Sequence, residues 1–158
     1  MATNAGTGMN ATVKRPPENA VSQFGMALRL LMDSPFHRKW RVGSVLERII
    51  PPIALGQVRI VVKDDQPVGF LTWALFTESA ENAYLKKHRK IKLEEWNAGD
   101  RLWFTDFVAP YGKVRKIIEA IDESLKSEQF YTTHGIAHFS RGGRGHRRGF
   151  FTKEKVNG

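Results

Sequence analysis

The spacing of apolar residues along the chain predicts two helices near the N-terminus. The first covers residues 20–32, where apolar side chains recur every three or four positions, as they do on one face of an amphipathic helix. That face consists of Val21, Phe24, Leu28 and Leu31. Pro35 ends the helix, because proline disfavours helical geometry at the residue before it. The second helical face consists of Val42, Val45, Leu46 and Ile49, and the prolines Pro51 and Pro52 end it. Between the two helices we expect a tight turn with His37 at an exposed corner.

The apolar period then becomes that of β-strands. Alternation over residues 58–62, a turn over 63–67 and an apolar run over 68–76 predict a hairpin. The later elements predicted are a short helix and loop over 78–93, a strand over 101–108, a helix over 113–125 and a strand over 130–139. The order predicts an α/β fold with a mixed central sheet, in which the last helix crosses between neighbouring strands.

Length and composition indicate a single folded domain. The chain has 158 residues, of which 41% are hydrophobic, enough to build a core. We expect the domain to cover residues 20–140, between a flexible N-terminal tail over 1–19 and a basic, glycine- and arginine-rich C-terminal tail over 141–158. The chain has no cysteine, which excludes disulfides, a cysteine nucleophile and a cysteine-rich zinc site.

The remaining composition bears on compartment and metals. No apolar run approaches the roughly 20 residues that span a bilayer, and the first 19 residues lack the apolar core of a signal peptide. We therefore expect a cytoplasmic protein without stable membrane insertion. His134 and His138 are four residues apart with no third ligand beside them, so we expect no metal.

Positive charge is concentrated at the C-terminal end. The formal net charge is +9, and residues 141–155 contain six basic residues against one acidic residue. Such asymmetry favours an acidic partner, whether a protein, a nucleic acid or a membrane surface.

Two segments contain residues suited to acyl transfer. The first is Ser34-Pro35-Phe36-His37-Arg38-Lys39-Trp40, and the second is Gly99-Asp100-Arg101-Leu102-Trp103-Phe104-Thr105-Asp106-Phe107-Val108-Ala109-Pro110-Tyr111-Gly112. They provide a histidine, a strand-borne carboxylate and a turn of backbone amides before a helix. Helix N-termini attract negatively charged groups, so this turn is a natural ligand site.

These segments, together with Pro67-Val68-Gly69-Phe70-Leu71-Thr72-Trp73-Ala74, resemble the RTX toxin-activating lysine acyltransferases, which have a fold like that of the GCN5-related N-acetyltransferases (GNAT). The resemblance covers about residues 24–125 in order. It implies transfer of a fatty acyl group from acyl-carrier protein to internal lysines of an RTX protoxin. The phosphopantetheine thioester of the carrier is then a co-substrate, and no cofactor is bound permanently. The resemblance also implies that His37 and Asp106 are needed for catalysis. At the C-terminus the chain departs from the family, whose members continue longer.

The chemistry of lysine acylation agrees with these residues. A lysine amine has a pKa of about 10.4, so only about one in 2,500 is neutral at pH 7. A base that accepts the proton promotes attack on a thioester, and histidine is well matched to that role. We expect Asp106 to accept from the other ring nitrogen of His37, and Ser34 to orient the ring or the acyl carbonyl. Direct transfer and an acyl-histidine intermediate both stay open.

Each of these residues also has a structural interpretation. His37 could be a surface histidine beside Arg38 and Lys39, and Ser34 could cap the turn. Asp106 would need a partner if buried, and an ion pair with Arg101 is the alternative.

We expect the turn after the third strand to bind the acyl donor. Its residues are Val108, Ala109, Tyr111, Gly112, Lys113 and Arg115. Gly112 permits close approach of the backbone to a ligand. Lys113 and Arg115 either attract the phosphate or lie on the solvated face of the helix. We expect Trp73, Trp103 and Phe104 to line the pocket for the fatty chain, with plain core packing as the alternative.

Two other functions compete with this interpretation. The run Arg141-Gly142-Gly143-Arg144-Gly145 resembles an arginine–glycine nucleic-acid segment. Against a nucleic-acid partner, the chain shows no recognisable binding fold, and a basic tail can also dock an acidic carrier protein. The other competitor is a coenzyme A-dependent N-acetyltransferase of small acyl groups. The two amphipathic helices are compatible with a homodimer.

Overall fold

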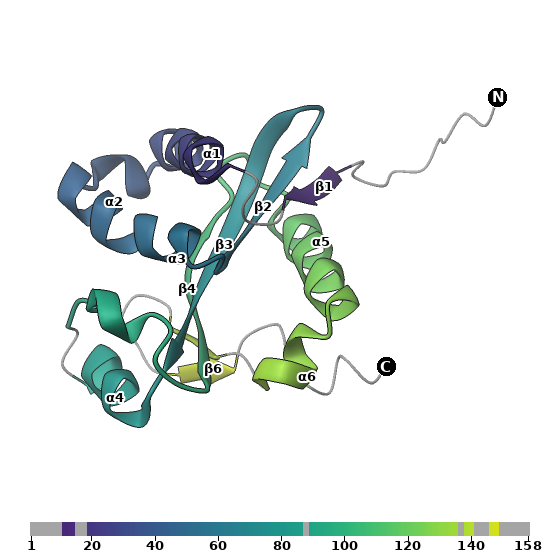
Figure 1. The fold of residues 1–158 in the computed structure, drawn as a ribbon. Helices are drawn as coiled ribbons and strands as arrows, with labels where there is room; N and C mark the ends of the chain where they lie inside the picture. The colour runs from purple at the N-terminus through teal and green to yellow at the C-terminus, as the bar shows by residue number, and fades with distance from the viewer. Residues whose placement is uncertain (1–10, 15–18, 87–88, 136–137, 141–145, 149–158) are drawn as a thin grey trace.

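A six-stranded sheet, with its strands in chain order, runs through the centre of the molecule (Figure 1). The computed structural model describes residues 11–14, 19–86, 89–135, 138–140 and 146–148. Neighbouring strands are antiparallel except for β4 and β5, which are parallel, so the predicted mixed sheet is confirmed. The strands are β1 (Ala11–Lys14), β2 (Val58–Lys63), β3 (Gln66–Phe76), β4 (Arg101–Val108), β5 (His138–Ser140) and β6 (His146–Arg148).

Helices cover both faces of this sheet (Figure 1). One face carries α1 (Ala20–Asp33), α2 (Val42–Arg48), α3 (Ile50–Ala54) and α4 (Glu78–Lys86), and the other carries α5 (Val114–Ser127) and α6 (Phe130–His134). Two short 3₁₀ turns, η1 (His37–Lys39) and η2 (Leu93–Glu95), lie on the first side. None of the described helices has the length and apolar character needed to cross a membrane.

Local sequence explains several element boundaries. The side chain of Asn19 accepts hydrogen bonds from two backbone amides and caps the start of α1. Asp64 and Asp65 both have positive φ, the geometry that lets a two-residue turn match the twist of a hairpin, so the β2–β3 turn is tighter than predicted. Pro51 and Pro52 follow the end of α2 but lie in the first turn of α3, where their missing N–H groups are not needed.

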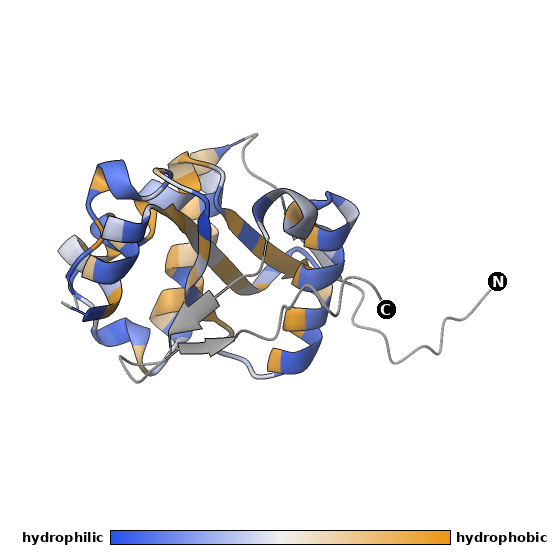
Figure 2. Cartoon of the chain, turned by 90° about the horizontal axis from the view of Figure 1, so that it is seen from below, coloured by the Kyte–Doolittle hydropathy of each residue, from blue (hydrophilic) through white to orange (hydrophobic). Residues whose placement is uncertain are grey.

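Each face of the sheet has its own apolar core. Figure 2 shows the hydrophobic residues gathered on the central strands and on stripes of the helices. Leu71 and Trp73 of β3 pack with Ile117 and Ile121 of α5 on one face. On the other face the largest group, under α1 to α3, includes Leu30, Ile49, Ile60 and Phe70. Full burial of one such side chain contributes about 1.5–3 kcal/mol. The sheet thus separates two layers, and residues on opposite faces cannot share a site.

Three segments differ from the sequence prediction. The strand predicted over residues 130–139 is wrong in its first half, because Phe130–His134 forms α6 and the strand is confined to His138–Ser140. Helical geometry brings the rings of Phe130 and His134 within 4.7 Å and buries Phe130 against Trp73, so packing overrides strand propensity. In the N-terminal segment predicted as a flexible tail, residues 11–14 form β1 on the edge of β2. In the predicted C-terminal tail, residues 146–148 form β6, and the rest lies outside the described residues.

Candidate active site

Ser34 and His37 form a closed turn at the end of α1. Pro35 prevents the helix from continuing, and Ser34 adopts an extended conformation as its C-terminal cap. The Oγ atom of Ser34 lies 2.7 Å from Nδ1 of His37, and the backbone N–H of His37 donates weakly to the same oxygen, at 3.5 Å. The imidazole ring packs edge-on against Phe36 and Trp40, with ring centroids 4.9 and 4.8 Å away. The orientation of His37 is therefore fixed on several sides.

The surroundings of His37 favour a neutral ring. Burial, reinforced by the positive charge of Arg48, lowers the pKa of His37 below its ordinary value of 6.5. The Ser34 hydroxyl engages Nδ1, which leaves Nε2 as the nitrogen for chemistry. When Nδ1–H donates to Ser34, Nε2 carries the lone pair and can accept a proton.

Asp106 lies on β4 with its side chain only 6% exposed, and Arg48 of α2 binds both of its oxygens. The Nη2 atom of Arg48 donates to Oδ1 at 2.9 Å and to Oδ2 at 3.2 Å, and Nε donates to Oδ2 at 3.3 Å. The guanidinium also lies 5.0 Å from the ring centroid of Trp40, the residue that contacts His37. Burial raises the pKa of the Asp106 carboxyl, and Arg48 opposes that shift.

This arrangement differs from the predicted one. Within the described part of the chain no hydrogen bond joins His37 to Asp106, and Arg48 takes the place of the expected contact. The alternative ion pair between Asp106 and Arg101 is also wrong, because Arg101 binds Glu81 and Glu78 of α4. Five residues along an extended strand span about 16 Å, too far for a side-chain pair.

A bulge in β4 determines which face Asp106 occupies. Thr72 of β3 pairs with Asp106, whereas the next residue, Trp73, pairs with Phe104, so Thr105 is an extra residue. The hydroxyls of Thr72 and Thr105 bond at 2.8 Å inside this bulge. Phe104 packs on the α5 face, and strict alternation would place Asp106 there as well. The bulge instead directs Asp106 to the face that carries Arg48.

The predicted donor turn lies beside the end of α1. The hydroxyl of Tyr111 donates to Asp33, the residue before Ser34. Gly112 has a φ of +79° and its amide donates to Ala109 at 3.3 Å, while Val108 is buried at the end of β4. A Cβ added to Gly112 would meet no atom within 4 Å, so the space beside it is open.

The two cations predicted for this turn are exposed. Lys113 precedes α5 in a left-handed conformation and does not cap the helix with its side chain. Arg115 points into solvent and pairs with Glu119 one turn later, at 2.9 Å. Their positions are those of a solvated helix start.

The predicted lining of the acyl pocket is not brought to His37. Trp73 and Phe104 are buried on the α5 face, across the sheet from Asp106. Trp103 lies on the same face as Asp106 but is buried, and its ring nitrogen donates to Glu81 at 2.8 Å. The core interpretation describes these contacts, because the sheet separates Trp73 and Phe104 from the histidine and Trp103 is buried in the core beside α4.

Sequence reasoning missed Arg48, Trp40 and Tyr84. Tyr84 of α4 is largely buried near Arg48 and Asp106, and burial raises the pKa of its hydroxyl. Arg48 follows Val45 by three residues and precedes Ile49, both buried, so the helical period does place it at the edge of the inward face. The helical period is therefore a signal that Arg48 faces inward, but it does not identify Asp106 as its partner.

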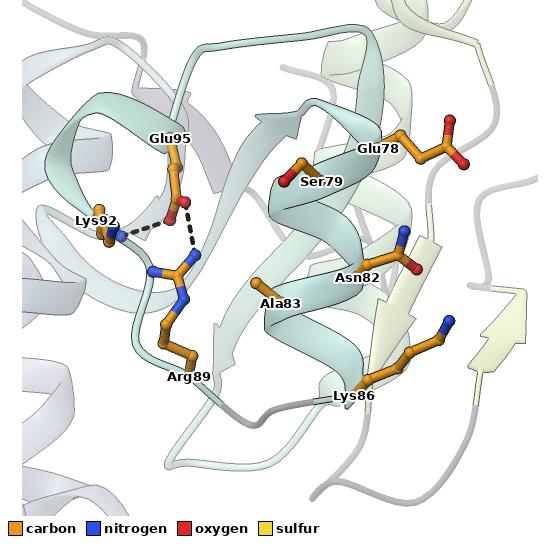
Figure 3. A pocket seen from close by; sticks show the side chains of 8 residues that line it. All are labelled: Glu78, Ser79, Asn82, Ala83, Lys86, Arg89, Lys92 and Glu95. Atoms are coloured by element: carbon orange, nitrogen blue, oxygen red, sulfur yellow. Dashed lines mark hydrogen bonds and ion pairs between the residues drawn. The ribbon is translucent and has the colours of Figure 1, made fainter.

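A separate hollow lies between α4 and η2 (Figure 3). Its volume of about 700 Å³ would hold a small molecule, but its lining is charged and polar rather than apolar. Glu95 accepts from Arg89 at 2.6 Å and from the backbone N–H of Lys92 at 2.9 Å, so much of that charge is already paired. It contains none of the predicted site residues.

Comparison with known proteins identifies the family. The sequence profile of the RTX toxin acyltransferase family matches residues 16–148. The chain is 36% identical over 95 residues to the RTX-II toxin-activating lysine-acyltransferase ApxIIC of Actinobacillus pleuropneumoniae, a match that covers 60% of this chain and 59% of that protein. It is 34% identical over 121 residues to the leukotoxin-activating lysine-acyltransferase LktC of a Pasteurella haemolytica-like species, covering 72% and 73% of the two chains.

The fold has a counterpart among solved structures. The loading GNATL domain of CurA from Lyngbya majuscula superposes with a TM-score of 0.51 at 9% identity, over 82% of this chain and 63% of that one. The GNAT-like fold expected from the sequence is therefore confirmed at the level of architecture. With a family profile that spans most of its length, the chain belongs to the RTX toxin acyltransferase family.

Proposed function

We propose that this protein is a lysine acyltransferase that moves a fatty acyl group from the phosphopantetheine thioester of acyl-carrier protein to internal lysines of an RTX protoxin. The observation that carries the proposal is the 2.7 Å contact between Ser34 and His37, which engages one ring nitrogen and leaves the other for proton transfer. Family membership supplies the reaction class, and both relatives described above are toxin-activating lysine acyltransferases by name.

In the proposed reaction His37 acts as the general base. The neutral lysine amine attacks the thioester carbon, a C–N bond forms, and the carbonyl π electrons move to oxygen. Nε2 of His37 takes one proton from the attacking nitrogen. Collapse of the tetrahedral intermediate breaks the C–S bond, and the imidazolium returns the proton to the departing thiolate. The products are an amide and the free carrier thiol.

Asp106 supports this chemistry through Arg48 in our proposal. The carboxylate fixes the guanidinium, which rests on Trp40, and Trp40 in turn packs against His37. Direct transfer and an acyl-histidine intermediate both use Nε2. The intact mass of the enzyme after incubation with loaded carrier alone separates them, because only the covalent route adds an acyl group to His37.

The carrier would approach across the η1 corner. Arg38, Lys39 and Arg41 are exposed there, and among the residues that the structure describes they have no ion-pair partner. Acyl-carrier proteins are typically acidic, so these cations complement the donor. The open turn at Gly112 lies beside the same helix end and would hold the pantetheine arm.

Intact-mass analysis of a candidate RTX protoxin tests the proposal. Incubation with this protein and carrier loaded with a C14–C18 chain should add acyl mass on lysine. His37→Ala should abolish the gain in mass. The matched control is His134→Ala, which removes a partly buried histidine of α6 and should retain the gain. Equal gain with His37→Ala would remove His37 as the base. Gain from acetyl-coenzyme A but from no carrier would indicate a small-acyl transferase instead.

A further inference from the structure

Arg48 carries hydrogen-bond donors that Asp106 does not use. Its Nε and Nη2 atoms bind the carboxylate, whereas Nη1 has no partner among the residues that the structure describes. The side chain is 41% exposed, so a bound molecule can reach these two N–H groups. A purely structural ion pair would have no need of an accessible free edge.

The free edge is also held in place. Both carboxylate oxygens of Asp106 accept hydrogen bonds from the guanidinium, and the flat face of the guanidinium lies over Trp40, 5.0 Å from the ring centroid. Donors fixed before the reaction stabilise a developing charge without reorganising, which is the property required of an oxyanion site.

The guanidinium of Arg48 lies near His37. Arg48 and His37 contact the same Trp40 ring, and the charge of Arg48 is felt at the imidazole. That charge keeps the ring neutral but does not stabilise the imidazolium that forms when His37 takes a proton. The positive charge of Arg48 instead stabilises a negatively charged oxygen that forms close by while His37 takes the proton.

We propose that Arg48 binds the oxyanion that develops on the acyl carbonyl during transfer, with its Nη1 group donating to that oxygen. The inference rests on the proposed function. When the lysine nitrogen attacks, the C=O π electrons become the oxyanion, and they return to C=O as the thiolate leaves. Arg48 donates hydrogen bonds throughout and neither gains nor loses a proton. Asp106 is a positioning residue for Arg48.

The test uses two unreactive carriers and the full-length protein. One carrier ends in a phosphonate, a tetrahedral anion in place of the thioester, and the other ends in a thioether without the carbonyl oxygen. Calorimetric affinities are measured for wild type, for Arg48→Lys and for the double variant Arg48→Gln/Asp106→Asn, which leaves no buried charge unpaired. Arg89→Gln is the control, because Arg89 also pairs with a carboxylate at similar exposure but lies in the hollow of Figure 3.

Wild type and Arg89→Gln should prefer the phosphonate, by a factor of about 10²–10³ if it captures what one oxyanion donor contributes. The double variant should lose that preference while binding the thioether carrier as before, and kcat should fall with KM unchanged. Arg48→Lys should lie between, and it decides the matter if the double variant does not fold. An undiminished phosphonate preference in both Arg48 variants would overturn the assignment of Arg48 alone. Failure of wild type to bind either carrier would overturn the proposed function together with it.

Discussion

Replacing Arg48 by methionine should expose how much the buried carboxylate of Asp106 depends on its partner. Removing one member of a buried ion pair costs about 3–5 kcal/mol, because the remaining charge is stranded in a poor solvent. Arg48 is 41% exposed, so water screens part of the pair, and we expect about 2–3 kcal/mol. Methionine keeps an apolar chain against Trp40, which limits the loss of packing.

The destabilisation should depend on pH in one direction. Burial raises the pKa of Asp106, and without Arg48 nothing opposes that shift. When the pKa of a carboxyl is higher in the folded state than in the unfolded state, its contribution to folding stability is fully present below the unfolded pKa. That stability is lost as pH rises through the folded pKa, because the carboxylate must then be buried with its charge. The difference between wild type and Arg48→Met should therefore be larger at pH 7 than at pH 5.

Urea unfolding at the two pH values measures both effects. Asp106→Asn should cost less than Arg48→Met, since the partner left behind is the more exposed one. The double variant Arg48→Met/Asp106→Asn should be more stable than Arg48→Met alone. For a chain of this length 1 kcal/mol corresponds to roughly 2–4 °C in Tm, so Arg48→Met should melt about 4–12 °C lower at pH 7. A loss below about 0.5 kcal/mol that does not change with pH would refute the reasoning.

Three further outcomes follow from the structure. The acid limb of the pH profile of kcat/KM should lie below pH 6.5, because the pKa of His37 is lowered and the ring loses its proton below that pH. An acid limb above pH 6.5 would contradict the assignment of His37 as the base. Gly99→Ala should lower the Tm strongly in thermal unfolding, since its Cβ would lie 2.2 Å from a backbone oxygen. Gly25→Ala should instead stabilise the protein by about 0.5–1 kcal/mol, because Gly25 lies inside α1 with open space around the added Cβ. The KM for the carrier should rise as the salt concentration rises. The double variant Lys39→Glu/Arg41→Glu should have a higher KM at low salt and a weaker dependence of KM on salt. A wild-type KM that does not change with salt would exclude charge steering.

Local patterns account for the parts of the molecule that the sequence predicted well. The period of apolar residues predicted α1, β4 and α5 within two residues of their observed bounds. The two helices each bury one face against the sheet, and β4 is a short, nearly continuous apolar run that is buried on both faces. The turn that positions Ser34 and His37 depends on Pro35 and on contacts within seven residues. Such geometry is available from neighbours in the chain.

The partners of Asp106 could not be obtained in that way. Side-chain alternation assigns a strand residue to a face only while the register holds, and the extra Thr105 reverses the assignment for the second half of β4. No local pattern in Phe104-Thr105-Asp106 signals the bulge. The Arg48–Asp106 pair, 58 positions apart, forms only once α2 lies on the correct face. α6 was missed for a related reason, since Phe130 gains its helical position from Trp73 across the core.

The hydrogen bond from Tyr111 to Asp33 ties the turn after β4 to the C-terminal end of α1. Asp33 also accepts from Arg29 and is the chain neighbour of Ser34, so the turn after β4 is tied to the chain one residue before the turn that holds His37. If binding of the acyl donor displaces Tyr111 and shifts the end of α1 at His37, linkage requires that a change at His37 alters the affinity for the donor by the same free energy. Substitutions at Tyr111 therefore test whether donor binding and the base are coupled, even though this phenol need not touch the reacting atoms.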